Sequence, residues 1–255
     1  MDARRLDIMH HALLLLLDNR LHLAPIGPNP TRILDIGTGT GIWAIDAGDR
    51  YPGAEVIGTD LSPIQPGWVP PNVYFQIDDA ESEWTFAKDS FDLIHIRHLS
   101  GSIKDWGALI EQVYKHLKPG GYIDICELEM HLSSDDGTAH PGLDLSKYCE
   151  LLNKAAAVLG QDFETITNLK PLIERAGFVN VRHEKMRLPL GTWPVDPKQK
   201  IIGAYVLITI ESGFEACGLR LLTCVLDMDQ ASFAVLTERA KKNAYDRNIH
   251  GYSWQ

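Results

Sequence analysis

The feature that most constrains the fold is the stretch LDIGTGTGIW, residues 34–43. A short apolar run ends at Gly37, and further glycines follow at Gly39 and Gly41. Glycine reaches backbone conformations with positive φ and lets a ligand lie directly on the main chain. A strand that turns into a helix also leaves backbone N–H groups free where the helix begins. The stretch therefore predicts a strand, a ligand-binding loop and a helix in succession.

The spacing of the glycines indicates which kinds of ligand the loop is suited to bind. The dinucleotide fingerprint G-x-G-x-x-G would need its third glycine at position 42, where this chain has Ile42. A phosphate-binding loop would end in Gly-Lys-Ser/Thr, which is also absent. Asp35 stands two residues before Gly37, and its carboxylate suits a cationic ligand better than a pyrophosphate.

Short apolar runs alternate with helical patterns through the first half of the chain. Five runs that end at glycine or at acidic residues predict strands, over residues 32–37, 55–60, 73–80, 91–98 and 121–130. Helices are predicted over 41–51 and from Asp105, an N-cap candidate, to the stop Lys-Pro-Gly-Gly. The pattern predicts an α/β fold, with a Rossmann-like, doubly wound, mostly parallel sheet and helices on both faces. Ligands bind such sheets at the carboxyl ends of the strands.

We expect one domain over residues 1–255. It would comprise an N-terminal helix within 1–30, a ligand-binding core over 31–132, and helical additions over 143–255 that form a lid. One further strand is expected near 179–188.

The charge balance and the cysteines limit the possible partners. The formal net charge of −10 opposes binding to a phosphate backbone. The four cysteines form no Cys-x-x-Cys pair, so neither a metal site nor a disulfide framework is expected. The apolar run 12–17 is too short to cross a bilayer. We therefore expect an intracellular protein, cytoplasmic with the nucleus as the alternative, that binds neither nucleic acid nor membrane.

The pattern D-x-G-x-G-x-G resembles the first motif of class I S-adenosylmethionine-dependent methyltransferases. Further motifs follow in order at the strand ends, including TD at 59–60, IDDA at 77–80 and LKPGG at 117–121. The resemblance implies S-adenosylmethionine as cofactor and S-adenosylhomocysteine as product. The alternative is a related domain that has lost this cofactor or binds another nucleotide.

The resemblance also implies the cofactor residues. Asp60 would hold both ribose hydroxyls, since a carboxylate accepts two hydrogen bonds. Asp79, with Asp78 as its rival, would take the adenine amino group, and Leu61 would pack on the adenine face. The implied set is Asp35, Gly37, Thr38, Gly39, Gly41, Asp60, Leu61, Asp78, Asp79, Ala80 and Arg97.

A narrower resemblance covers nearly the whole chain. The segments TDLSPIQP, IDDAESEW, LPLGTWP and NIHGY are similar to those of the LaeA-like fungal methyltransferases, a group associated with secondary metabolism. Relatives carry an extra segment before RLDI and a final strand after the IHGY position. Without that strand the edge at 179–188 would be bare, so we expect a homodimer, a protein partner or a rearranged tail to cover it.

Acid–base candidates flank the expected methyl-transfer site. His98, after the fourth strand, is the first candidate for a general base, and His131, after the fifth, is the second. Each could instead only shape the pocket. The candidates for substrate binding are His98, Glu127, His131 and Trp193. Glu127 could instead simply end a strand, and Trp193 could pack a turn.

Other polar residues have more than one interpretation. Arg97 would face the cofactor carboxylate, contribute only its backbone, or make a surface salt bridge. His95 would pack beneath a helix. Arg5, His10 and His11 would close over the cofactor or lie on a solvated helix face. The resemblance implies methylation of oxygen or nitrogen on a small molecule of fungal secondary metabolism. The alternatives are a protein methyltransferase or regulator that acts through a protein partner, and a cofactor-bound isomerase or cyclase.

Overall fold

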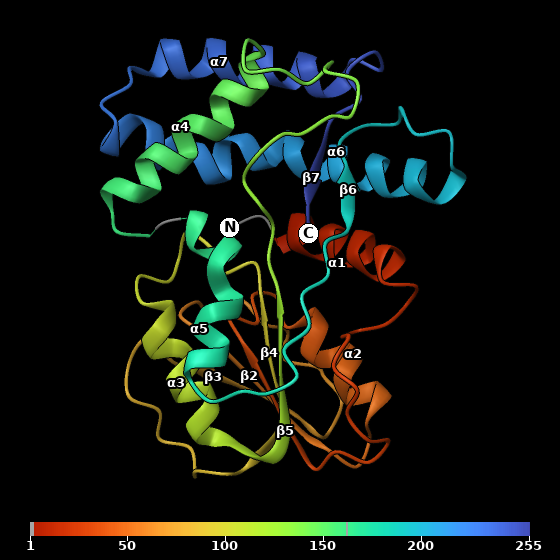
Figure 1. Ribbon diagram of the computed structural model, residues 1–255, viewed down its shortest axis with the longest axis vertical. Helices are drawn as coiled ribbons and strands as arrows, with labels where there is room; N and C mark the ends of the chain where they lie inside the picture. The colour runs from red at the N-terminus through yellow and green to blue at the C-terminus, as the bar shows by residue number, and fades with distance from the viewer. Residues whose placement is uncertain (1–2, 162) are drawn as a thin grey trace. The chain divides into compact units, whose positions relative to one another are not determined.

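The computed structural model describes residues 3–161 and 163–255 (Figure 1). The chain divides into two compact units. The sheet unit comprises Arg20–Glu127 and Thr167–His183, and the helical unit comprises Met1–Asn19, Leu128–Ile166 and Glu184–Gln255.

The sheet unit is built on five parallel strands. They pair in the order β3-β2-β1-β4-β5, and their bounds are β1 Arg32–Ile36, β2 Glu55–Asp60, β3 Val73–Ile77, β4 Phe91–Arg97 and β5 Leu117–Cys126. The chain crosses over between β3 and β4, so the strand order reverses beside β1. The predicted doubly wound parallel sheet is confirmed, and its carboxyl ends meet at one edge.

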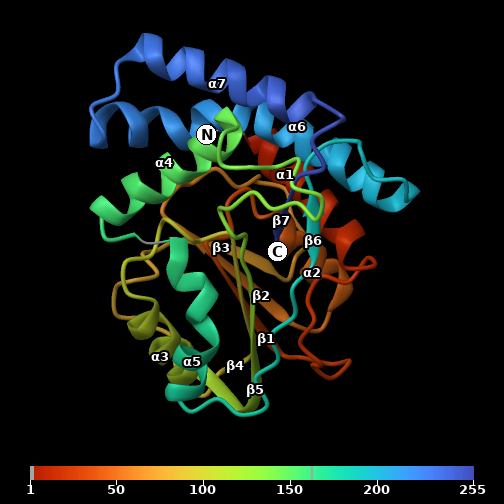
Figure 2. The same cartoon turned by 45° about the horizontal axis from the view of Figure 1, so that its top comes forward.

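Helices cover both faces of this sheet (Figures 1 and 2). On one face α2, Ile42–Arg50, packs Trp43 and Ala47 onto Ile33 and Leu93 of the strands. On the other lie α3, Trp106–His116, and α5, Leu169–Arg175. The strands therefore carry apolar side chains on both faces, as buried parallel strands require.

Helix α3 begins where the sequence predicts. The carboxylate of Asp105 accepts a hydrogen bond from the amide of Ala108, which satisfies one free N–H of the first turn. The helix ends at His116, and β5 begins at once with Leu117, which pairs with Phe91. The fifth strand thus starts earlier than the predicted residue 121, because the Lys-Pro-Gly-Gly segment belongs to the strand.

The helical unit contains four longer helices and a small sheet. Its elements are α1 Ala3–Leu16, α4 Asp144–Val158, β6 Arg187–Pro189, α6 Pro197–Arg220 with the π-helical turn η2 Leu221–Val225, α7 Gln230–Tyr245 and β7 Tyr252–Trp254. The 3-10 helix η1, Phe163–Asn168, follows α4. Helix α6 packs against α1 and α7, and α4 packs against α7. Buried residues such as Leu152, Leu222 and Ala240 form the core between these helices.

The segment Pro197–Val225 is long and apolar enough to cross a membrane by length and composition alone. A core helix passes the same test, and buried residues of α6 such as Ile202 and Phe214 lie in the hydrophobic clusters of the helical unit.

The strand expected near 179–188 is wrong in its extent. Only Arg187–Pro189 is a strand, and it pairs antiparallel with β7 rather than with the main sheet. The predicted segment also crosses the boundary between the two units, at His183 and Glu184. The Arg187 guanidinium lies over the rings of Tyr252 and Trp254, which fixes this pairing. The tail of the same chain therefore pairs with β6, which agrees with the expected rearranged tail; a homodimer or a protein partner stays a prediction.

Candidate cofactor site

The glycine loop has the backbone that only glycine adopts easily. Gly37, Gly39 and Gly41 have φ of 66°, 59° and 80°. A Cβ added to Gly37 would lie 2.3 Å from Leu99, and one added to Gly41 would lie 2.3 Å from Phe75. Side chains of the sheet unit thus pack directly against the loop. The predicted succession of strand, loop and helix is confirmed.

Asp35 and Thr38 fix the start of the loop. Asp35 is buried, and the Thr38 hydroxyl donates to its carboxylate at 2.6 Å. The Thr38 amide donates to the carbonyl of Thr59 on β2. Arg97 lies nearby, at the end of β4. Its burial lowers the pKa of the guanidinium, and the negative charge of Asp35 opposes that shift. Arg97 is half-buried, and its role toward the cofactor carboxylate stays a prediction.

Asp60, at the end of β2, lies directly against the loop. Its carboxylate accepts the amide of Gly39 at 2.8 Å and that of Ser62 at 2.9 Å. Each oxygen retains a further lone pair for a hydroxyl donor. The sequence predicted that Asp60 lies at the cofactor site. It did not predict that Asp60 also holds the glycine loop.

Gln65 is a residue of this site that the sequence reasoning missed. Its side-chain amide donates to the carbonyl of Gly39 at 2.6 Å and to that of Ser62 at 3.0 Å. The backbone of Gly39 is therefore held at its N–H by Asp60 and at its carbonyl by Gln65. The signal that could have revealed it is an amide side chain among prolines in TDLSPIQP, directly after the Asp60 strand.

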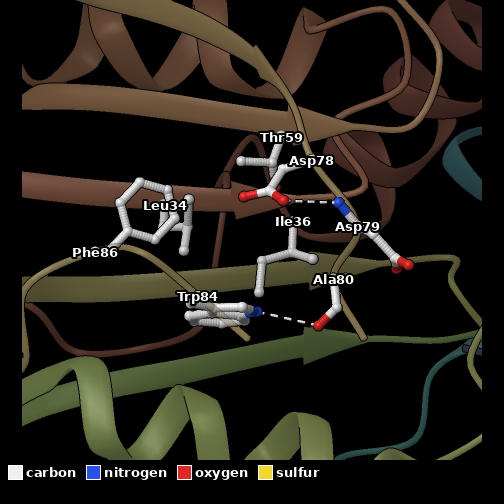
Figure 3. A pocket seen from close by; sticks show the side chains of 8 residues that line it. All are labelled: Leu34, Ile36, Thr59, Asp78, Asp79, Ala80, Trp84 and Phe86. Carbon is white, nitrogen blue, oxygen red and sulfur yellow. Dashed lines mark hydrogen bonds between the residues drawn. The ribbon is translucent and has the colours of Figure 1, made fainter. Parts of the chain in front are cut away.

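A small pocket opens beside β1 and β2, where the predicted adenine residues lie (Figure 3). It is lined by Leu34, Ile36, Thr59, Asp78, Asp79, Ala80, Trp84 and Phe86. Asp78 accepts the amide of Asp79 at 2.9 Å, and the Trp84 indole donates to the carbonyl of Ala80 at 3.0 Å. The side chain of Leu61, on the loop after β2, is 70% exposed and could pack against a ligand ring.

His98 and Glu127 meet where β4 and β5 end. His98 has a left-handed φ of 53°, and its amide donates to the carbonyl of Cys126. The carboxylate of Glu127 accepts the amides of Leu99 at 2.8 Å and Ser100 at 3.1 Å. Burial raises the pKa of Glu127 to about 7, against the opposing effect of these bonds and of Arg97.

His131 and Trp193 belong to the helical unit, so they are not among the residues that the sheet unit brings together. The carbonyl of His131 accepts the hydroxyl of Ser253. The Trp193 indole donates to the carbonyl of Gly251 at 3.0 Å, and its ring centroid lies 5.2 Å from that of His250. These contacts hold a turn in place; the substrate roles of both residues stay predictions.

Three further histidines were singled out in the sequence: His95, His10 and His11. His95 stacks on Trp43 with ring centroids 3.9 Å apart and bonds Asp124, so its predicted place beneath a helix is confirmed. His10 is 1% exposed, so the interpretation that it lies on a solvated helix face is wrong. It lies on the side of α1 that is buried within the helical unit. His11 is exposed.

The residues present fit S-adenosylmethionine. The positive-φ loop offers a backbone surface without side chains, and Asp60 offers a carboxylate to a vicinal diol beside it. Beside it, a small pocket is lined by apolar side chains and by the acids Asp78 and Asp79, whose carboxylates could accept a hydrogen bond from an amino group. All these groups lie within the sheet unit.

Comparisons with known proteins agree with this geometry. Residues 8–183 match a family model described as a methyltransferase domain. The chain is 39% identical over 247 residues to methyltransferase pytC of Aspergillus terreus, covering 96% of this chain and 76% of that protein. It is also 39% identical over 255 residues to secondary metabolism regulator LAE1 of Cochliobolus heterostrophus, covering 98% and 83%.

Solved structures share the fold. Phosphoethanolamine N-methyltransferase 2 of Haemonchus contortus, in complex with phosphomonomethylethanolamine and S-adenosylhomocysteine, is similar with a TM-score of 0.54 and 21% identity. That match covers 96% of this chain and half of the other. The [4+2]-cyclase SpnF is similar with a TM-score of 0.54 and 16% identity, covering 95% and 78%. The chain therefore belongs to the methyltransferase domain family, as a LaeA-like class I methyltransferase that uses S-adenosylmethionine.

Proposed function

We propose that this methyltransferase methylates an oxygen or nitrogen atom of a small molecule in fungal secondary metabolism. The observation that carries the proposal is His98, a titratable side chain at the carboxyl end of β4, on a turn packed against the cofactor loop. An acceptor hydroxyl or ammonium group must lose a proton, whereas an acceptor without one would need no such group. The relative pytC, a methyltransferase from a fungus, supports the same class.

The cofactor supplies an electrophilic methyl group and its own leaving group, so the chain must mainly bind, orient and exclude water. In this proposal Asp60 accepts the ribose hydroxyls, and Asp79, or its rival Asp78, accepts the adenine amino group. Leu61 packs on the adenine, and Arg97 faces the cofactor carboxylate. S-adenosylmethionine would supply the methyl group and the sulfur leaving group, and His98 would take the proton that the acceptor atom loses.

A second candidate is methylation of a protein, or regulation through a protein partner. The relative LAE1 favours it, since its name is that of a secondary metabolism regulator and its identity to this chain equals that of pytC. This alternative would place the acceptor or the partner on a macromolecule, in the nucleus or the cytoplasm.

Calorimetric titration with S-adenosylmethionine and with S-adenosylhomocysteine is the first test. We expect micromolar binding of both. Radiolabelled S-adenosylmethionine is then offered separately to fungal metabolite extracts and to fungal protein fractions. Label in an extractable small molecule, lost in a His98→Ala variant that still binds S-adenosylhomocysteine, supports the proposal. Label in protein alone would favour the second candidate. A metabolite converted without label would identify an isomerase or cyclase.

A further inference from the structure

We propose that Glu127 is a positioning residue that holds the turn His98–Ser100 against the first glycine of the cofactor loop. Its carboxylate would thereby set both the affinity for the cofactor and the place of the His98 side chain. The inference rests on the cofactor site and not on the identity of the methyl acceptor.

The turn needs such a support because its backbone is unusual. His98 has a left-handed φ of 53°, which a residue other than glycine adopts only where the surroundings determine it. Its amide bonds Cys126 on β5, and the next two amides both point at Glu127. Three consecutive amides of the turn are thus bound from the end of β5.

Both oxygens of Glu127 are used for this purpose. One accepts Leu99 at 2.8 Å and the other accepts Ser100 at 3.1 Å. Only an ionised carboxylate has two oxygens that both accept hydrogen bonds and carry no hydrogen of their own. A glutamine of the same shape would turn its NH2 group toward one of the two amides.

The turn transmits this restraint to the cofactor loop through Leu99. Its side chain fills the space beside Gly37, where an added Cβ would lie only 2.3 Å from a Leu99 methyl group. A turn released from Glu127 would let Leu99 move away and leave the loop unsupported. Glu127, Leu99 and Gly37 therefore connect the carboxyl ends of β5, β4 and β1.

The restraint depends on pH in the neutral range. Burial raises the pKa of Glu127 to about 7, while the amides of Leu99 and Ser100, the Ser100 side chain and the positive charge of Arg97 lower it. Protonation puts a hydrogen on one oxygen, which then accepts an amide poorly. His98 lies on the same turn and carries a titratable imidazole, so an experiment has to separate the two groups.

Asp92 offers a matched control at the opposite end of the same strands. Its carboxylate accepts the amides of Thr31 at 2.8 Å and Arg32 at 2.9 Å and pairs with Lys118. It thus ties the amino ends of β1, β4 and β5, far along the strands from the glycine loop. Asp92→Asn weakens a comparable carboxylate tie without touching the turn.

The test compares Glu127→Gln with Asp92→Asn, using calorimetry with S-adenosylhomocysteine and amide hydrogen exchange. We expect Glu127→Gln to weaken binding about tenfold at pH 8, as for the loss of a charge-assisted hydrogen bond. It should also lose protection at the amides of Leu99 and Ser100. Asp92→Asn should bind within about twofold of the wild type, because its effect is confined to stability.

The wild-type protein supplies a second readout that needs no variant at Glu127. Protection of these two amides, corrected for intrinsic exchange, should fall as the pH is lowered from 8 to 6. A His98→Asn variant, whose asparagine tolerates the left-handed backbone, should retain this dependence. The proposal is overturned if folded Glu127→Gln binds and protects like the wild type. If wild-type protection at these amides does not change between pH 8 and 6, the pH dependence of the restraint is refuted, and the comparison of Glu127→Gln with Asp92→Asn still decides the positioning role.

Discussion

Among single residues, Asp60 carries the most direct prediction for the cofactor. Its carboxylate holds the amide of Gly39 and is placed to accept a vicinal diol. Replacing it with alanine removes both functions, so Asp60→Ala should weaken S-adenosylhomocysteine binding by about 1.5–3 kcal/mol. Calorimetry measures the loss, and circular dichroism checks that the variant is folded. Unchanged affinity in a folded variant would refute the assignment of Asp60 to the ribose.

Gln65 supports a smaller prediction at the backbone of the same glycine, Gly39. Its amide donates to the carbonyls of Gly39 and Ser62, at 2.6 and 3.0 Å. Gln65→Leu should weaken cofactor binding by about 1 kcal/mol, because the loop loses one neutral hydrogen-bond donor at its central glycine. Gln65→Glu is the matched variant: it keeps the shape but has no N–H to donate. If the glutamate variant binds as the wild type does, the donor is not what holds the loop.

At the scale of elements, the cap of α3 can be tested alone. Asp105 accepts the amide of Ala108 at 2.9 Å, and the helix buries Leu109, Ile110 and Val113. Asp105→Ala should lower the free energy of unfolding by about 1 kcal/mol, the usual cost of losing an N-cap. Urea denaturation measures it. Asp105→Ser retains a capping oxygen and should stay close to the wild type; an equal loss in both variants would show that the cap is not the cause.

The elements differ in how far the sequence predicts them. The five parallel strands and α3 follow from local signals, namely apolar runs that end at glycine or acid and an aspartate cap. The pairing of β6 with β7 does not, because it joins residues 187–189 to 252–254 through Arg187 and two aromatic rings. An isolated strand pattern near 179–188 cannot indicate which distant segment will pair with it.

The residues of the candidate site also differ in how far the sequence predicts them. The glycine loop and Asp60 stand at motif spacings that are read along the chain. Gln65 and Glu127 act on backbone groups of segments far from them in sequence, Gly39 and Leu99 respectively. Those contacts depend on which strand ends the sheet brings together, and the sequence alone predicts only that the ends share one edge.

At the scale of the whole molecule, the described residues of the cofactor site all belong to one of the two compact units. The sheet unit must therefore be folded under the conditions of each binding test. Its central strands are tied at their amino ends by Asp92, which connects Thr31, Arg32 and Lys118.

This tie predicts how stability depends on pH. Partial burial raises the pKa of Asp92, but the Lys118 ammonium and the amides of Arg32 and Thr31 outweigh it and lower the pKa from 3.8 to about 2. The folded state therefore binds fewer protons than the unfolded state between these values. The stabilisation is complete above about pH 4 and is lost as the pH falls toward 2. Because the side chains of Asp92 and Lys118 are 28% and 32% exposed, solvent screening reduces it to about 1–2 kcal/mol.

Asp92→Asn tests this prediction directly. Amide exchange or urea denaturation of the variant at pH 7 should show the loss of about 1–2 kcal/mol, since the amide has no charge for Lys118 and one acceptor fewer. Between pH 4 and 2 the wild type should lose this same amount and approach the variant, because protonated Asp92 and asparagine are both neutral. A constant difference between the two proteins across that range would mean that the ionised form of Asp92 is not what ties the strands together.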